Sequence, residues 1–138
     1  RDVRPLGGQH PVRRLLIDSH VALWWLSGAA ALGPTSRAAL TDADVVLYSA
    51  VTPWELGIKE SLGKLTLPED LVDALTNTGF TPLDITADHA RRAAALPPHH
   101  RDPFDRMLIA QAQLESLVIV TADGSFGDYD VDRLDART

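Results

Sequence analysis

Three short apolar segments dominate the hydrophobic pattern of the chain. They are RLLID at 14–18, DVVLYSA at 44–50 and LVIVTAD at 117–123. Their apolar residues are consecutive and do not alternate with polar ones, which is typical of parallel strands buried on both faces. Weaker strand signals lie at Phe80–Asp84 and Val131–Leu134. We therefore predict a parallel sheet of about five strands.

Helical segments fill the intervals between these strands. We expect helices in LIDSHVALWWL after a cap at Ser19, and at Thr35–Leu40, Thr52–Leu65, Pro68–Thr76, Thr86–Leu96 and Asp102–Ser116. Thr52-Pro53 and Asp102-Pro103 each place a capping residue before a proline, an arrangement favoured in the first turn of a helix. The alternation of strands and helices predicts an α/β fold in which helices cover a parallel sheet.

The length of 138 residues corresponds to about one domain. Residues 1–13 are polar and aperiodic, so we interpret them as a disordered leader before a domain at 14–138. The chain has no cysteine, which excludes disulfides and thiolate chemistry. It also has no apolar run of ~18 residues and no secretory signal, so we expect a cytoplasmic protein that does not enter a membrane.

The net charge of −6 excludes an overall basic footprint for nucleic acid. Four acids nevertheless lie where an open α/β sheet binds ligands, beyond the carboxyl ends of its strands. Asp18 ends the first strand, Asp123 follows the third, and Glu55 and Asp105 lie in the first turns of two predicted helices. We expect these four carboxylates to meet at one edge of the sheet.

Helical spacing places two of these acids on apolar faces. The residues that share a face with Asp105 are Leu108, Ile109 and Ala112, and those that share a face with Glu55 are Ile58, Leu62 and Leu65. We predict that both faces pack against the sheet. A carboxylate on such a face needs a partner.

Each acid also has a purely structural interpretation, which the sequence leaves open. Thr52 and Glu55 fit a capping box, and Asp102 fits a helix cap ahead of Asp105. Asp18 fits a cap for the helix that follows it, and Asp123, in Ala-Asp-Gly, fits a turn.

Several carboxylates in one place repel each other by roughly 4 kcal/mol per pair at ~4 Å and an effective dielectric of 20. They need either basic partners or a cation. The basic candidates near them in sequence are Lys59, Lys64, Arg101 and Arg106. The cation that suits an all-oxygen donor set is Mg²⁺ or Mn²⁺, which activates water for phosphodiester hydrolysis.

Four segments resemble the VapC-type toxins among the PIN-domain nucleases. They are LLIDSHVALWWL at 15–26, SAVTPWELGIKESLGKLTLP at 49–68, LPPHHRDPFDRMLIAQA at 96–112 and LVIVTADGSF at 117–126. The resemblance covers roughly residues 14–135, in the family's order and spacing. The acidic positions of the family fall on Asp18, Glu55, Asp105 and Asp123. The stretch at 51–53 departs from the family in carrying a proline, away from any ligand position.

The resemblance implies a three-layer α/β/α PIN-like fold and an endoribonuclease that uses Mg²⁺ or Mn²⁺. It implies cleavage of tRNA, rRNA or mRNA, a homodimer, and a small VapB-type antitoxin that directs a basic side chain into the acidic pocket. We expect Asp18, Asp105 and Asp123 to bind the metal, and Glu55 to bind it or to orient the attacking water.

Other polar residues near the acids have weaker assignments. We expect Ser19 and Thr121 to hold carboxylates in place, with local backbone capping as an equal alternative. Arg101 and Arg106 are candidates for RNA contact. We interpret His99-His100-Arg101-Asp102 as a solvated loop, because adjacent side chains seldom point the same way. The apolar stretch Trp54–Leu67 is a candidate dimer or antitoxin surface.

Other classes of protein fit less well. A receiver-like regulatory module needs an acidic pair at the first strand and a lysine after the last core strand, and both are missing here. A haloacid-dehalogenase-type phosphatase needs an acid two residues after Asp18, where this chain has His20. A catalytically silent PIN-like binding module is the remaining alternative, and the four acids argue against it.

Overall fold

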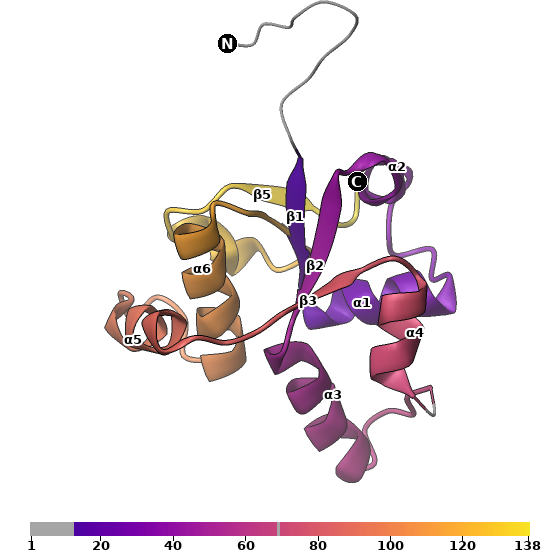
Figure 1. Ribbon diagram of the computed structural model, residues 1–138, viewed down its shortest axis with the longest axis horizontal. Coiled ribbons are helices and arrows are strands. Elements are labelled where there is room, and N and C mark those ends of the chain that lie inside the picture. Colours follow the sequence, from indigo (N-terminus) through magenta and orange to yellow (C-terminus); the bar gives the residue numbers. More distant parts are fainter. Residues whose placement is uncertain (1–12, 69) are drawn as a thin grey trace, which may run out of the picture.

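The computed structural model describes residues 13–68 and 70–138. The five strands are β1 (Arg14–Ile17), β2 (Val45–Ser49), β3 (Thr81–Leu83), β4 (Val118–Thr121) and β5 (Arg133–Asp135). All pairings between them are parallel, in the order β3-β2-β1-β4-β5. The predicted five-stranded parallel sheet is confirmed, with β1 at its centre (Figure 1).

Within the described ranges, six helices surround this sheet: α1 (Ser19–Ser27), α2 (Pro34–Asp42), α3 (Val51–Ser61), α4 (Leu71–Asn77), α5 (Ala87–Ala95) and α6 (Pro103–Glu115). A short 3-10 turn, η2 (Gly124–Asp128), follows β4. The helices α1, α2 and α4 lie on one face of the sheet, and α5 and α6 lie on the other (Figure 1). The α/β/α layering predicted for the domain is confirmed.

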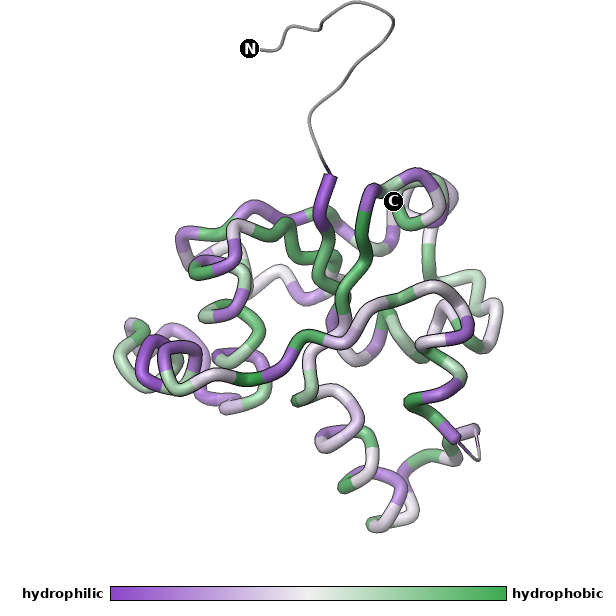
Figure 2. Tube along the Cα trace, viewed as in Figure 1, coloured by the Kyte–Doolittle hydropathy of each residue, from purple (hydrophilic) through white to green (hydrophobic). Residues whose placement is uncertain are grey.

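Successive residues of the strands supply the two apolar cores between these layers. Leu15 and Ile17 belong to the core shared with α1 and α4, whereas Leu16 belongs to the core shared with α5 and α6. All three are buried. The continuous apolar character of β1 is therefore the signature of a strand covered on both faces, and it is visible as the green centre of the molecule (Figure 2).

Helix α3 takes a position that the sequence did not predict. It lies beyond the carboxyl edge of the sheet and contributes to both cores, through Leu56 on one side and Val51 on the other. It ends at Ser61, before the predicted limit of Leu65, because Gly63 adopts a left-handed conformation with a φ of 74°. Ile58 in this helix and Leu62 at its C-cap are exposed, so the prediction that the Glu55 face packs on the sheet is wrong.

The remaining element boundaries differ by a few residues. The fourth helix begins at Leu71, because Asp70 accepts the Asp73 N–H as its cap, and not at Pro68. The leader predicted at 1–13 lies outside the described residues except for Arg13, whose N–H donates to the Asp44 carboxylate at 2.6 Å. No helix in the described part of the chain is long and apolar enough to cross a membrane.

Candidate active site at the carboxyl edge of the sheet

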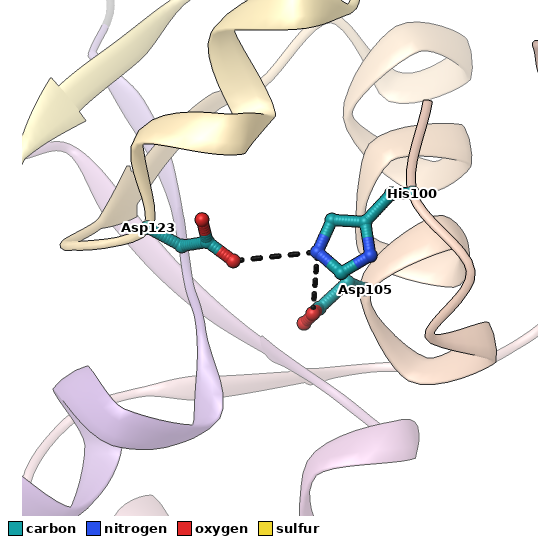
Figure 3. Close-up of side chains that lie close together, drawn as sticks. All are labelled: His100, Asp105 and Asp123. Atoms are coloured by element: carbon teal, nitrogen blue, oxygen red, sulfur yellow. Dashed lines mark hydrogen bonds and ion pairs between the residues drawn. The ribbon is translucent and has the colours of Figure 1, made fainter. Parts of the chain in front are cut away.

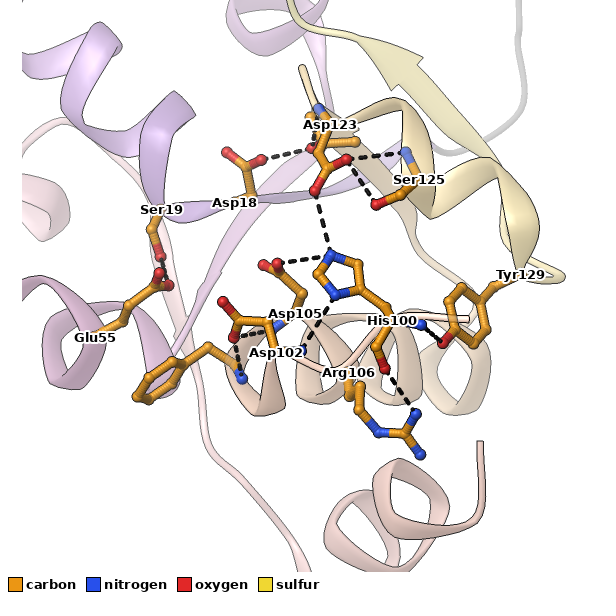
Figure 4. A network of polar contacts seen from close by, with 12 residues as sticks. Asp18, Ser19, Glu55, His100, Asp102, Asp105, Arg106, Asp123, Ser125 and Tyr129 are labelled. Carbon is orange, nitrogen blue, oxygen red and sulfur yellow. Dashed lines mark hydrogen bonds and ion pairs between the residues drawn. The ribbon is translucent and has the colours of Figure 1, made fainter. Parts of the chain in front are cut away.

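The four acids predicted from the sequence line a single cavity of about 270 Å³. It lies beyond the carboxyl ends of β1 and β4, and its wall also includes Asp102, Trp24, Lys59 and Arg137. The carboxylates come from four separate segments, which the parallel topology directs to the same edge (Figure 4). The expectation that distant acids converge is therefore met by the fold.

Asp18 follows the central strand and is only 6% exposed. Its Oδ1 accepts the Val21 N–H at 2.9 Å, so Asp18 is the cap of α1. The cap predicted at Ser19 is wrong, and the alternative interpretation of Asp18 as a helix cap is confirmed. Its Oδ2 accepts the hydroxyl of Thr121 at 2.6 Å. Burial raises the pKa of Asp18, and these two hydrogen bonds oppose the rise. The residue is thus both a helix cap and a fixed carboxylate in the cavity wall.

Glu55 is held from two sides and is 7% exposed. The Ser19 hydroxyl donates to Oε1 at 2.7 Å, and Lys59 Nζ lies 3.1 Å from Oε2. The capping box with Thr52 is not formed, because the helix begins one residue earlier and Thr52 is buried inside its first turn. Ser19 therefore orients a carboxylate, and Glu55 already has a cationic partner.

Asp105 lies in the first turn of α6, behind the cap that Asp102 provides. Oδ1 of Asp102 accepts the N–H groups of Phe104 and Asp105 at 2.8 and 3.3 Å. The face below Asp105 is buried as predicted, since Leu108, Ile109 and Ala112 are enclosed. Burial raises the pKa of Asp105 to about 7, and the neighbouring charge of Asp102 adds to the rise. The ionised form of this carboxyl is therefore destabilised in the folded protein.

Asp123 caps the 3-10 turn and is the most accessible of the four acids. Its Oδ1 accepts the N–H and the hydroxyl of Ser125 at 2.9 and 2.7 Å, and its own N–H donates to Thr121 at 3.0 Å. Burial alone would raise the pKa of Asp123, but the bonds from Ser125 and His100 outweigh it and lower the pKa. Thr121 therefore contacts both Asp18 and Asp123.

His100 is the residue that the sequence interpretation missed. Its Nε2 lies 3.0 Å from Oδ2 of Asp105 and 3.3 Å from Oδ2 of Asp123 (Figure 3). The solvated-loop interpretation is wrong for this side chain, which is 17% exposed. Adjacent side chains do diverge, since exposed His99 packs against Tyr129 while His100 points inward. One feature of the sequence could have indicated this position. Asp102-Pro103 marks the start of α6, so His100, two residues earlier, lies close to the first turn of that helix.

The two candidate RNA-contact arginines have different surroundings. Arg106 donates to main-chain carbonyls of the segment 93–100, including those of Ala93 and Leu96 at 2.8 Å each. Its guanidinium therefore ties this segment to α6, and we do not retain it as an RNA contact. Arg101 is exposed and borders an apolar groove between α3, α5 and α6.

The donor set suits a hard divalent cation. The wall of the cavity offers carboxylate oxygens from Asp18, Asp105 and Asp123, with no sulfur ligand. Carboxylate oxygens of Asp105 and Asp123 lie within 4.8 Å of each other. Among the described residues, Glu55 is the acid of this cavity that has a lysine partner, so unpaired negative charge remains on the others. Burial is the main cause of the raised pKa of Asp105, and the charges of Asp102, Glu55 and Asp123 add to it. Mg²⁺ and Mn²⁺ are the ions that such an oxygen set prefers.

The chain belongs to the PIN-domain family, whose model matches residues 15–132. Among curated relatives it is 30% identical over 117 residues to Ribonuclease VapC22 of Mycobacterium tuberculosis. That match covers 79% of this chain and 86% of the relative. The resemblance to VapC-type PIN-domain ribonucleases, predicted from the four sequence segments, is confirmed.

Solved structures share the fold at lower sequence identity. One is the VapBC2 complex of Rickettsia felis bound to a promoter DNA fragment, with a TM-score of 0.66 and 12% identity over 88% of this chain and 97% of that chain. Another is a toxin–antitoxin complex from Klebsiella pneumoniae, with a TM-score of 0.61 and 20% identity over 84% of this chain and 92% of that chain. FitAcB from Neisseria gonorrhoeae has a TM-score of 0.57 and 22% identity over 87% of this chain and 96% of that chain.

Proposed function

We propose that this protein is a metal-dependent endoribonuclease that acts as the toxin of a toxin–antitoxin pair in the cytoplasm. The observation that carries the proposal is the convergence of four acids from distant segments on one cavity. Membership of the PIN-domain family and the relationship to a VapC ribonuclease support the same activity. We assign Mg²⁺ or Mn²⁺ as the cofactor on the chemistry of the carboxylate donors.

The acids have different roles in this proposal. Asp18, Asp105 and Asp123 hold the metal ion, which when bound supplies an activated water and stabilises charge on the phosphate. Thr121 keeps Asp18 and Asp123 in place through its hydroxyl. Glu55, fixed by Ser19 and Lys59, lies in the same wall and orients the attacking water.

The rim of the cavity offers groups that suit the backbone of an RNA strand. Lys59 and Arg137 line the cavity beside the acids, and Arg137 lies over the ring of Trp24 at 5.9 Å. These cations compensate locally for the net charge of −6. We propose that they and Arg101 hold phosphates of a tRNA, rRNA or mRNA substrate.

The decisive experiment compares cleavage of a labelled RNA by the wild type and by variants of the metal-holding acids. We expect cleavage to stop with EDTA and to return with Mg²⁺ or Mn²⁺. Asp105→Asn and Asp18→Asn should each lower the rate by at least ~100-fold, which corresponds to about 2.7 kcal/mol of transition-state stabilisation. Asp88→Asn, on an exposed turn of α5, is the matched control and should cleave normally.

Two outcomes of that comparison would refute the proposal. Cleavage that persists in EDTA would show that no divalent ion is needed. Folded wild-type protein that cleaves no RNA class with either metal would favour the catalytically silent binding module.

We also propose that the exposed apolar face of α3 mediates assembly. Trp54, Ile58 and Leu62 follow one another at helical spacing, and Trp54 and Leu62 are 62% and 64% exposed. Trp54 packs edge-on against Phe104 at the apolar groove between α3, α5 and α6. We assign this face to a homodimer, and we propose a VapB-type antitoxin as the second partner because related folds occur in such complexes.

Light scattering of the isolated protein tests the dimer. We expect Trp54→Ser combined with Leu62→Ser to shift the mass from dimer to monomer, whereas Val72→Ser, an exposed apolar site on α4, should not. A wild-type protein that stays monomeric at high concentration would refute the dimer. Co-expression with a small reading frame that neighbours the gene tests the antitoxin.

A further inference from the structure

His100 contacts the acids from outside the cavity that they line. The wall of that cavity includes Asp105 and Asp123 but does not include His100. The imidazole Nε2 approaches Oδ2 of both carboxylates at 3.0 and 3.3 Å (Figure 3). In Figure 4, Asp18 lies on the opposite side of these two carboxylates from His100. The imidazole is therefore placed behind the proposed metal ligands.

A main-chain hydrogen bond fixes which imidazole nitrogen carries hydrogen. The Asp102 N–H donates to Nδ1 of His100 at 3.2 Å, so Nδ1 presents a lone pair. A neutral imidazole has one N–H, which must then be at Nε2. Nε2 thus donates to Asp105 and Asp123, and it has no lone pair to offer an ion.

The loop around His100 is held by contacts that keep this orientation. The His100 N–H donates to the hydroxyl of Tyr129 at 2.7 Å, and that hydroxyl donates to the Pro97 carbonyl at 2.7 Å. Arg106 donates to the His100 carbonyl at 3.1 Å. The ring also packs edge-on against Phe126. The main chain and the ring are both anchored, so the N–H points at the carboxylates in a defined direction.

We propose that His100 is a positioning residue for the metal site and not a metal ligand. Its Nε2–H holds Asp105 and Asp123 from behind and directs their remaining lone pairs toward the cavity. Hydrogen-bond partners of metal-binding groups typically change metal affinity by ~10–100-fold. This inference rests on the proposed metal-dependent function.

The first test measures Mn²⁺ affinity without RNA, by the EPR signal of free Mn²⁺ during a titration. His100→Phe keeps a ring of similar size against Phe126 but removes the N–H, and we expect it to weaken binding by ~10–100-fold. His100→Gln keeps a donor on a flexible chain and should recover part of that loss. His99→Ala, in the same loop but facing outward, should bind as the wild type does.

The second test separates a donor from a ligand. Pulsed EPR of the Mn²⁺-loaded protein should show the same nitrogen couplings in the wild type and in His100→Phe. A coupling of directly bound nitrogen that is lost in this variant would overturn the proposal. Circular dichroism checks the fold of each variant, and His100→Ala replaces the Phe variant if the larger ring is not accommodated.

The failure of this inference is distinguishable from failure of the proposed function. Unchanged Mn²⁺ affinity in folded His100→Phe, with binding lost in Asp105→Asn, would refute the role of His100 and leave the metal site intact. Absence of Mn²⁺ binding in the wild type would refute both.

Discussion

The helices α3 and α6 look alike in sequence and differ in the structure. Each carries an acid in its first two turns, above apolar residues at helical spacing. On α6 these residues are buried and Asp105 has a raised pKa. On α3, Ile58 and Leu62 face outward, and Glu55 pairs with Lys59. The same periodic pattern therefore marks a core helix in one case and a free surface in the other.

The difference between the two helices shows which carboxylates of the site have a basic partner and which do not. Asp105 stands on a buried helix and, among the described residues, makes no ion pair with a lysine or arginine, so burial leaves its ionised form unfavourable and a bound cation would relieve this. Glu55 stands on a helix at the edge of the fold and is already neutralised. A cation site needs acids of the first kind more than acids of the second.

The largest expected effect is a loss of stability caused by a substitution on the buried face of α6. Leu108→Ala should lower the free energy of unfolding by about 2–5 kcal/mol, since it opens a cavity in a closed core. Leu62→Ala on the exposed face should change it by less than about 0.5 kcal/mol in monomeric protein. Urea denaturation measures both values. Equal losses would contradict the assignment of the two faces.

The next effect concerns the charge on Asp105. Its pKa is about 7 in the folded protein against 3.8 in the unfolded chain, so the folded state binds more protons between these values. The free energy of unfolding of the metal-free protein should therefore fall as the pH rises through this window. Asp105→Asn should remove this contribution and stabilise the metal-free protein at pH 8 by on the order of 1–2 kcal/mol, because solvent screens part of the effect at a partly exposed carboxyl.

Denaturation with EDTA across pH 4 to 8 measures this contribution, and the pH profile of Asp88→Asn is the control. A variant that is less stable than the wild type at pH 8 would contradict the electrostatic account. Addition of Mn²⁺ should stabilise the wild type and not the variant, because only the wild type keeps all the carboxylates that we propose as metal ligands.

The smallest expected effect is the loss of stability when the ion pair between Glu55 and Lys59 on α3 is removed. Lys59→Met removes the half-buried partner of Glu55, and we expect a loss of about 0.2–1 kcal/mol, typical of an i,i+4 pair near the surface. Lys64→Met, beyond the end of α3, should cause no measurable change. Thermal denaturation at low and high salt checks the ionic origin, because the loss should shrink at high salt.

Most of the sheet and the convergence of the acids could be predicted from the sequence. Continuous apolar strands such as Leu15–Ile17 and the residues that follow them determine one edge of a parallel sheet. The packing of α3 could not be predicted, because periodicity shows that a face is apolar but not what covers it. His100 was missed because its direction depends on the cap at Asp102 and on Tyr129, which is distant in sequence.

The order of the segments along the chain has a consequence for how this cavity is assembled. Asp18 is synthesised before its hydroxyl partner Thr121, which follows 103 residues later, and before the acid Asp123. A growing polypeptide therefore cannot complete the cavity while β4 is still inside the ribosome. The cavity is therefore completed only after β4 and the residues that follow it have been synthesised and have paired with β1.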